Sequence, residues 1–255
     1  MFVVDASSNA FEWVIFLLQK YSKMFLEGSL TTLYVATLGT FLGVLLGLLV
    51  GLMQDASSGK NESLVRAVLL RIGKIIAKVY IEIFRGTPMI VQGMIIYYGL
   101  RQSGVEITSV TAGLFVMFLN TGAYMSETVR SGIGSIDRGQ REGALAMGLS
   151  GTGTMIFVIL PQAIRNIIPE MCNTFLTNLK MTSVLNVIGV SELFYMAKTA
   201  GGTYYKYFEA YLAIAVIYFV LCFVFSRLIA LLEKLLQGRK DYVLAAEYIE
   251  SEALA

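Results

Sequence analysis

Charged and polar side chains inside long apolar stretches are the residues of this sequence best placed to bind a ligand. Arg85 stands in Phe84-Arg85-Gly86-Thr87-Pro88, a polar break between two apolar stretches. A guanidinium beside such a break presents a cation and freed backbone groups, both of which suit a carboxylate. The candidate residues for contact with a polar ligand are Arg85, Thr87, Glu82, Asn120, Glu127, Lys180, Thr182 and Ser183.

Internal pairing is the alternative role for these charges. Arg85 could pair with Glu82, and Glu127 could pair with Arg130, so that the charges only hold helices together. Glu82 could otherwise complement the ammonium group or the basic side chain of a ligand. The two cations Arg85 and Lys180 are equal in number to the two carboxylates of Glu82 and Glu127. This balance does not decide whether the ligand has an acidic or a basic side chain.

Several kinds of active site are excluded by the residue types. Histidine is absent, which removes the commonest general base and metal ligand. The pair Gly59-Lys60 is followed by Asn61 and lacks a properly spaced upstream glycine, so the sequence contains no P-loop for ATP. We therefore expect no catalytic, metal or cofactor site on this chain. A net charge of +2 is too small to indicate nucleic-acid binding.

The composition favours a protein that crosses a membrane several times. Of 255 residues, 56% are hydrophobic and 15% are charged, whereas about a quarter of the residues of a soluble domain are charged. Runs of about 20 apolar residues are long enough to span a bilayer. The predicted fold is all-α, with five transmembrane helices at residues 30–53, 64–100, 110–133, 163–188 and 207–236.

Two segments of the chain depart from the pattern of simple spans and loops. Residues 64–100 contain the break at Gly86-Thr87-Pro88, so we expect one span that bends or re-enters there; a separate sixth span is the alternative. Residues 190–202 carry Glu192 and Lys198, and we expect a short surface segment.

The N-terminal part has the pattern of a helix lying on the membrane surface. Apolar residues recur at helical spacing over residues 10–27, and Trp13 suits the interface. Asp5 and the lack of a basic stretch before an apolar run argue against a signal peptide. We assign residues 1–27 to an N-terminal interfacial helix, residues 28–236 to a transmembrane domain and residues 237–255 to a cytoplasmic tail.

A glycine stripe marks the first predicted span. Gly39, Gly43, Gly47 and Gly51 follow one another at intervals of four residues, which places them on one face of a helix. Stripes of small residues let the backbones of two membrane helices approach closely. We expect another helix to lie along this stripe.

The basic residues are distributed unevenly between the loops. With five spans and the N-terminus outside, the outer side carries only Lys20, Lys23, Arg101, Lys198 and Lys206. The cytoplasmic side then carries Lys60, Arg66, Arg71, Lys74, Lys78, Arg130, Arg138, Arg141, Arg165, Arg227, Lys234, Arg239 and Lys240. This bias agrees with the positive-inside rule and places the loop at about residues 134–161 in the cytoplasm.

The loop at about residues 134–161 is longer than its position requires, since helix connections in bundles take about 2–8 residues. Its pattern predicts two short helices with a turn at Gly148 and Gly151, the second capped by Thr152 or Thr154. Arg138, Arg141 and Glu142 offer ion pairs to a soluble partner. The small residues that let such a partner approach the backbone are Gly143, Ala144, Ala146 and Gly148.

The same loop resembles the EAA motif of ABC importer permeases. That motif is Glu-Ala-Ala, three residues, Gly, nine residues, Ile, one residue and Leu-Pro. Every spacing is matched here, with Gly143 in place of the second residue and Val158 in place of Ile. The resemblance implies that partner ATPases dock on this loop through Arg141, Glu142, Gly143, Ala144, Gly148, Leu160 and Pro161.

Further segments, spread over about residues 28–235, resemble the polar amino-acid permease branch of type I importers. They are Phe84–Pro88, Gly122–Arg130, Leu160–Ala163, Lys180–Ser183 and Val187–Leu193. Met181 stands where that branch more often has Asn or Asp. The resemblance implies a multi-pass subunit of the bacterial inner membrane, surrounded by lipid, that transports a polar amino acid and catalyses no reaction itself.

The resemblance also implies the partners of such a subunit. These are two ATP-binding-cassette ATPase subunits, which bind ATP and Mg²⁺, a second permease subunit of the same or a homologous chain, and an external amino-acid-binding protein. A secondary transporter driven by an ion gradient is the alternative, but it leaves the cytoplasmic loop unexplained. A membrane anchor that only recruits an ATPase would leave Arg85, Asn120 and Lys180 unexplained.

Overall fold

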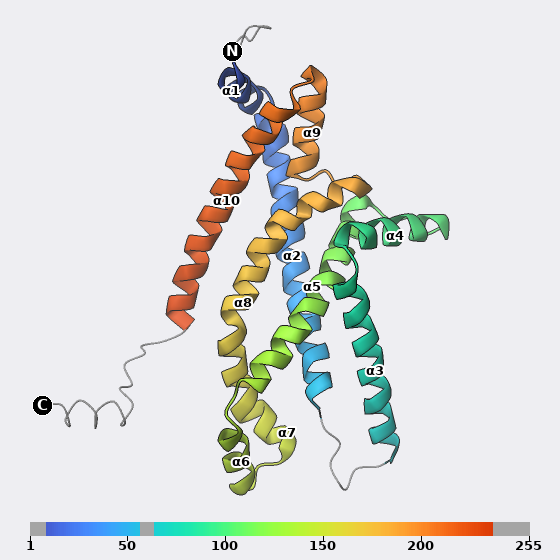
Figure 1. Cartoon of the computed structure of the whole chain (residues 1–255), viewed down its shortest axis with the longest axis vertical. Coiled ribbons are helices and arrows are strands. Elements are labelled where there is room, and N and C mark those ends of the chain that lie inside the picture. The colour runs from blue at the N-terminus through green and yellow to red at the C-terminus, as the bar shows by residue number, and fades with distance from the viewer. Residues whose placement is uncertain (1–8, 57–63, 237–255) are drawn as a thin grey trace, which may run out of the picture.

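The computed structural model describes residues 9–56 and 64–236, and every regular element in these ranges is a helix. The elements are α1 (Ala10–Lys20), α2 (Ser22–Asp55), α3 (Leu64–Gly86), α4 (Met89–Gln102), α5 (Ser109–Gly134), α6 (Arg138–Ala146), α7 (Gly151–Thr154), η1 (Met155–Ile159, a π-helix), α8 (Leu160–Met181), η2 (Thr182–Ile188, a 3₁₀-helix), α9 (Leu193–Tyr204) and α10 (Tyr207–Leu236). The all-α class is confirmed. The long helices follow one axis, and α4 lies across it (Figure 1).

Three helical stretches in the described part of the chain are long and apolar enough to cross a membrane. They are Ser22–Asp55, Gly151–Ile188 and Tyr207–Leu232. The other two predicted spans correspond to α3 and α5, which are helical over 23 and 26 residues but carry more polar side chains. The predicted tail at residues 237–255 lies outside the described residues.

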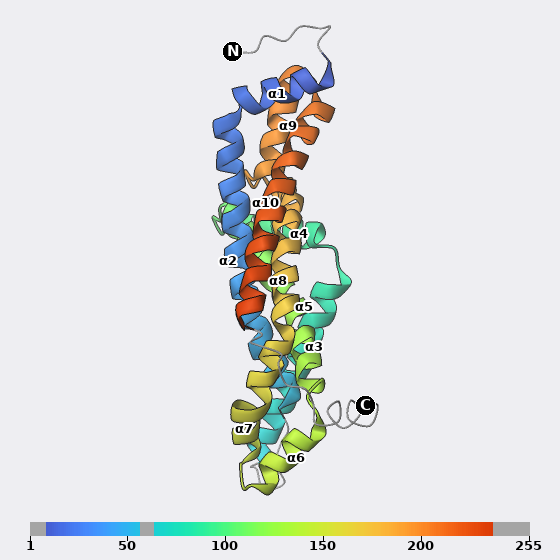
Figure 2. The ribbon, with the colours of Figure 1, turned by 90° about the vertical axis from the view of Figure 1, so that its left-hand side faces the viewer.

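The N-terminal helix is shorter than predicted. Asn9 and Glu12 form a capping box that begins α1, and the chain turns at Tyr21. Residues 22–27, expected in the interfacial helix, therefore belong to α2. Figure 2 shows α1 lying across the end of the bundle, beside α9.

Aromatic side chains attach α1 to that end. The rings of Trp13, Phe16 and Tyr204 form a cluster. The Trp13 and Phe16 ring centres are 5.6 Å apart, and each lies 5.5 Å from the ring centre of Tyr204. Lys20 lies over the rings of Phe16 and Tyr204, at 5.2 and 5.1 Å from their centres. Lys20 also donates to the Tyr204 hydroxyl, and this hydrogen bond raises the pKa of Lys20. α1 is thus attached to α9 by a cluster of aromatic rings and Lys20.

The predicted glycine stripe packs against α5. A Cβ atom added to Gly39, Gly43, Gly47 or Gly51 would lie 2.4, 2.6, 2.5 or 2.8 Å from Met117, Thr121, Met125 or Val129, respectively. Both rows advance by four residues, so one row of α5 side chains fills the groove that the glycines leave. This close pair forms the centre of the bundle.

Residues 64–100 form two helices rather than one bent helix. Pro88 has no N–H and disfavours a helical conformation at the residue before it, so α3 ends at Gly86 and α4 begins at Met89. The predicted break is therefore confirmed. With 14 residues, α4 is about 21 Å long, which is too short for the alternative sixth span across a core of about 30 Å.

The base of α8 differs in detail from the prediction. The hydroxyl of Ser150 accepts the N–H of Gly153 at 3.0 Å and caps α7, so the predicted cap at Thr152 or Thr154 is wrong. The hydroxyl of Thr154 is buried and has no partner among the described residues. α7, η1 and α8 then continue without interruption, and the π-helical turn ends at Ile159, directly before α8 begins at Leu160.

The segment at residues 190–202, predicted to lie on the surface, packs one face against the bundle and keeps Lys198 and Thr199 exposed. Glu192 is fully buried and caps α9, accepting the N–H groups of Phe194 and Tyr195 at 2.8 and 2.7 Å and the hydroxyl of Tyr218 at 3.0 Å. α9 lies against α2 and α10. The prediction failed because a buried, hydrogen-bonded carboxylate looks like an exposed one in sequence.

Candidate functional site

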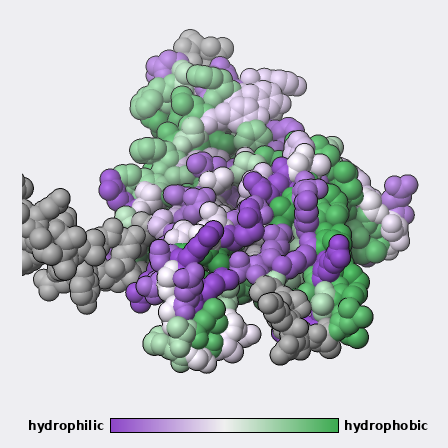
Figure 3. Space-filling view, turned by 60° about the horizontal axis from the view of Figure 1, so that its bottom comes forward, coloured by the Kyte–Doolittle hydropathy of each residue, from purple (hydrophilic) through white to green (hydrophobic). Residues whose placement is uncertain are grey.

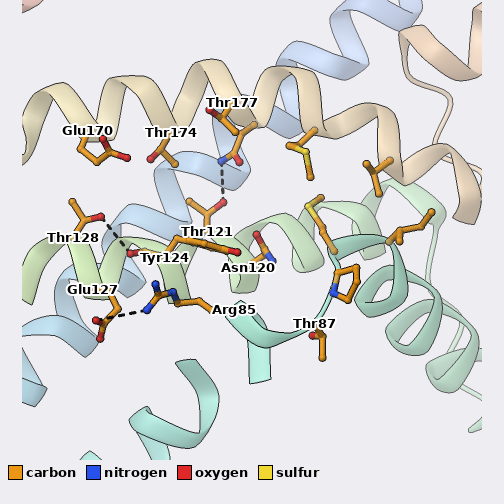
Figure 4. A pocket seen from close by; sticks show the side chains of 16 residues that line it. Arg85, Thr87, Asn120, Thr121, Tyr124, Glu127, Thr128, Glu170, Thr174 and Thr177 are labelled. Carbon is orange, nitrogen blue, oxygen red and sulfur yellow. Dashed lines mark hydrogen bonds and ion pairs between the residues drawn. The ribbon is translucent and has the colours of Figure 1, made fainter. Parts of the chain in front are cut away.

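A cavity of about 720 Å³ lies between the α3–α4 break, the middle of α5 and α8 (Figure 4). Its volume is in the range of small-molecule sites. The lining residues are Arg85, Thr87, Pro88, Met89, Ile90, Asn120, Thr121, Tyr124, Glu127, Thr128, Glu170, Thr174, Thr177, Asn178, Met181 and Val184. We call this space the central cavity.

Arg85 enters the central cavity from the last turn of α3. Its Nη1 lies 3.6 Å from Oε2 of Glu127, and its Cζ lies 5.6 Å from the ring centre of Tyr124. Arg130 holds the same Glu127 oxygen more closely, at 2.9 Å. Because Glu127 is shared and 43% of the Arg85 side chain is exposed, the guanidinium retains the capacity to bind an anion.

One of the two predicted internal pairs is present. Glu127 pairs with Arg130, as the alternative role proposed. Glu82 instead pairs with Lys78, one helical turn earlier, at 3.7 Å, and Arg85 turns toward Glu127 on α5. The charge of Arg85 is therefore directed to the cavity between the helices rather than along its own helix.

The helix break leaves carbonyl groups that side chains satisfy. Thr87 Oγ1 donates to the carbonyl of Ile83 at 2.7 Å. The amide of Gln92 donates to the carbonyls of Phe84 and Thr87, each at 2.9 Å. Asn120 Nδ2 lies 3.0 Å from Gln92 Oε1 and 3.3 Å from the Phe84 carbonyl, which joins α5 to the break. These bonds hold Arg85 at a defined place.

A second amide joins three helices at the wall of the central cavity. Asn178 on α8 is buried and donates to Thr40 Oγ1 on α2 at 2.8 Å and to Thr121 Oγ1 on α5 at 2.9 Å. Hydrogen bonds of this kind connect helices within a membrane. Asn178 therefore fixes the α8 wall of the cavity relative to the α2–α5 pair.

Four of the predicted ligand residues line the central cavity and four do not. Arg85, Thr87, Asn120 and Glu127 meet there. Lys180 and Ser183 line a different cavity of about 420 Å³, next to α9 and α10. Thr182 is buried and donates to the carbonyl of Leu179 at 2.9 Å. Glu82 lines a third cavity, beside α3.

Sequence reasoning left out the α8 wall and the aromatic residue of α5. The polar lining residues not proposed are Thr121, Tyr124, Thr128, Glu170, Thr174, Thr177 and Asn178. A signal for the α8 set was present, since Glu170, Thr174 and Thr177 follow one another by four and three residues and so share a helix face. Which cavity these side chains line depends on how α8 packs against α5, and the sequence of α8 alone does not determine that.

The predicted coupling residues form a small helical unit at the end of the bundle opposite α1 (Figures 1 and 2). Ala144 on α6 is buried, whereas Glu142 and Gly143 are exposed. Arg141 pairs with Asp55 at the end of α2, at 3.3 Å. Gly148, at a φ of 89°, makes the turn toward α7. Leu160 and Pro161 begin α8.

Two exposed apolar side chains complete this unit. Leu145 and Met147 lie on or directly after α6, and 47% and 80% of their surfaces are exposed. Arg138, Arg141 and Glu142 are exposed on the same helix, so α6 offers a mixture of apolar and charged side chains suited to a protein partner. Neither Leu145 nor Met147 was among the coupling residues predicted from the sequence.

Comparison with known proteins gives consistent matches. Residues 43–238 match the family model described as binding-protein-dependent transport system inner membrane component. The arginine transport system permease protein ArtQ of Bacillus subtilis is 39% identical over 59% of this chain and 69% of its own length. The glutamine transport system permease protein GlnP of Escherichia coli K12 is 37% identical over 62% of this chain and 74% of its own length.

Solved structures agree with these matches. A crystal structure of an amino acid ABC transporter with histidines has a TM-score of 0.75 and 39% identity, covering 85% of this chain and 95% of that chain. An inward-facing MetNI methionine ABC transporter, at 18% identity and a TM-score of 0.64, shares the fold. The resemblance to ABC importer permeases is thereby confirmed. The chain belongs to the family of inner membrane components of binding-protein-dependent transport systems.

Proposed function

We propose that this chain forms the pathway for a polar amino acid in an importer driven by separate ATPase subunits. The central cavity supports this proposal most directly. Arg85 offers a cation to a carboxylate, while Glu127 and Glu170 offer acceptors to an ammonium group or a basic side chain. Both charges of an amino acid thus have partners in one cavity. The names of ArtQ and GlnP refer to arginine and glutamine, two such solutes.

The unit formed by α6 and α7 is proposed to receive the ATPases, which bind ATP and Mg²⁺. Glu142 and Met147 are exposed on it. α7 continues through η1 into α8, which carries one wall of the central cavity. A rigid movement of the docked unit would therefore tilt that wall directly.

The proposed assembly contains two permease subunits, two ATPases and an external amino-acid-binding protein. The central cavity is only partly enclosed by this chain, and a second permease subunit would close it. We propose that the end carrying α6 and α7 faces the cytoplasm, because Arg138, Arg141 and Arg165 gather there. The N-terminus would then lie outside the cell.

The alternative of an ion-gradient-driven transporter finds no support in the comparisons. The relatives are transport-system permeases, and the solved neighbour with 39% identity is an ABC transporter. The exposed α6–α7 unit, which that alternative leaves unexplained, is what an ATP-driven importer requires.

Reconstitution with the ATPase subunits tests the proposal. The charge reversal Glu142→Lys should weaken co-purification of the ATPase at least fivefold, because Glu142 is exposed and makes no ion pair within the described residues. Glu106→Lys, on the loop between α4 and α5, is the matched control and should bind normally. Uptake into vesicles that continues without ATP when an ion gradient is present would contradict the proposal.

A further inference from the structure

A basic cavity of about 450 Å³ adjoins the central cavity on the other side of Arg85 and Glu127. It lies between the end of α2, the polar face of α3 and the last turns of α5. The charged residues that line it are Lys74, Lys78, Arg85, Arg130, Glu82 and Glu127. Four cations thus face two carboxylates, which leaves two positive charges in excess.

The pairing inside the basic cavity concentrates this excess on α3. Arg85 and Arg130 share Glu127, at 3.6 and 2.9 Å. Lys78 lies 3.7 Å from Glu82, and 76% of the Lys78 side chain is exposed. Lys74, one turn earlier, makes no ion pair within the part of the chain that the structure describes. Lys74 therefore presents an ammonium group without a carboxylate partner in the described ranges, and Lys78, whose contact with the exposed Glu82 is long, can add a second cation for an anion.

The neighbouring face of α3 is apolar and exposed. Ile72, Ile75, Ile76 and Val79 each expose 48–64% of their surface. They lie on the same two turns of α3 as Lys74 and Lys78, but around the helix from them. A ligand that joins an anionic head to a long apolar tail would match both faces at once.

We propose that the basic cavity binds the phosphate headgroup of an anionic phospholipid. Basic pockets between transmembrane helices on the cytoplasmic side are suited to such headgroups, and that leaflet carries the anionic lipids. The amide of Gln54, which also lines the cavity, can donate a hydrogen bond to the phosphate alongside the two lysines. Figure 3 turns the α6–α7 end of the molecule toward the viewer. It shows hydrophilic side chains gathered across that end, with hydrophobic surface beside them.

The location gives the lipid access to the transport pathway. Arg85 and Glu127 line both the basic cavity and the central cavity. A phosphate beside Lys74 and Lys78 would compensate the excess charge there without occupying the central cavity. The lipid is therefore placed to affect the pair that we assign to substrate contact, while its own binding requires no substrate.

Native mass spectrometry of the purified permease tests this inference. Wild type is equilibrated with phosphatidylglycerol or with phosphatidylcholine, and K74Q/K78Q is compared with K23Q/K198Q, whose exposed lysines lie on α2 and α9 away from this cavity. We expect wild type and K23Q/K198Q to retain phosphatidylglycerol at least fivefold better than K74Q/K78Q. The charge-preserving K74R/K78R should retain it, which separates lost binding from lost folding.

Three outcomes would overturn the inference. Equal retention of phosphatidylglycerol by K74Q/K78Q and K23Q/K198Q would show that the lysines hold no headgroup. Displacement of the lipid by millimolar inorganic phosphate would identify a site for free anions. Efficient disulfide cross-linking of Lys78→Cys between two copies of the chain would show that a second subunit covers the cavity. Since none of these measurements involves transport, their failure would leave the proposed function standing.

Discussion

At the scale of residues, polar side chains in apolar surroundings were informative where they faced inward. Arg85, Asn120 and Glu127 were predicted from the sequence, and all three line the central cavity. Lys180 was predicted by the same argument, yet it lies two residues beyond Asn178 and therefore about 200° around α8. The sequence shows that a charge lies in a span, but the side it faces depends on how that helix packs.

Arg85 should be required for transport but not for folding. In Arg85→Ala, Glu127 keeps Arg130 at 2.9 Å, so no buried charge is left unpaired. A lost hydrogen bond to a charged group is worth about 1.5–3 kcal/mol, so we expect uptake to fall at least tenfold. Radiolabelled uptake into vesicles measures this loss, and size-exclusion chromatography checks assembly.

Arg85→Lys provides the matched variant for that measurement. It keeps the charge but removes the planar fork that binds both oxygens of a carboxylate. We expect it to transport at an intermediate rate. Uptake by Arg85→Ala at the level of wild type would remove Arg85 from the pathway.

At the scale of elements, local signals predicted those features that a short stretch of chain determines alone. The glycine stripe of α2 and the break at Pro88 are of this kind, since each follows from spacing or from the chemistry of proline. The end of α1 was missed because the apolar spacing continues through Tyr21 into α2. The burial of α9 was missed because it depends on α2 and α10, which are far away in sequence.

A β-branched residue in the glycine stripe should weaken the α2–α5 pair. In Gly43→Val, the new Cβ would lie 2.6 Å from the Cβ of Thr121, which is a steric clash. The backbone N of Gly122 on α5, at 3.2 Å, leaves little room to relieve it. Overpacking of this kind costs about 1–3 kcal/mol. We expect a lower midpoint of thermal unfolding in detergent than for wild type.

Gly99→Val on α4 is the control for this substitution. A Cβ at Gly99 would meet nothing within 4 Å, so the same change in size carries no clash. Equal thermal midpoints for Gly43→Val and Gly99→Val would mean that the stripe does not hold the two helices together.

At the scale of the whole molecule, the chain separates three tasks along its length. The aromatic attachment of α1 lies at one end, the central cavity lies near the middle, and the α6–α7 unit lies at the other end (Figure 1). Charge bias predicted that these ends face opposite sides of the membrane. The sequence does not show which apolar helix faces would contact the proposed second permease subunit and which would contact lipid. Both kinds of surface have the same composition.

Labelling of single cysteines should show the predicted orientation. In a chain with Cys172 and Cys222 replaced by serine, Lys23→Cys should react with a membrane-impermeant maleimide in intact cells. Met147→Cys, exposed on the opposite end, should react only after the membrane is permeabilised. Reaction of Met147→Cys in intact cells would reverse the assigned orientation.

The pairing of α2 with α5 also has a consequence for how the chain is made. α2 is complete at Asp55, but its partner is complete only at Gly134. At about 5–20 residues per second, a ribosome takes roughly 4–16 seconds to add the intervening chain. During that time the groove along Gly39–Gly51 has no α5 to fill it. The nascent α2 must therefore wait in contact with lipid or with the insertion machinery, and a delay between α3 and α5 would prolong this vulnerable stage of biogenesis.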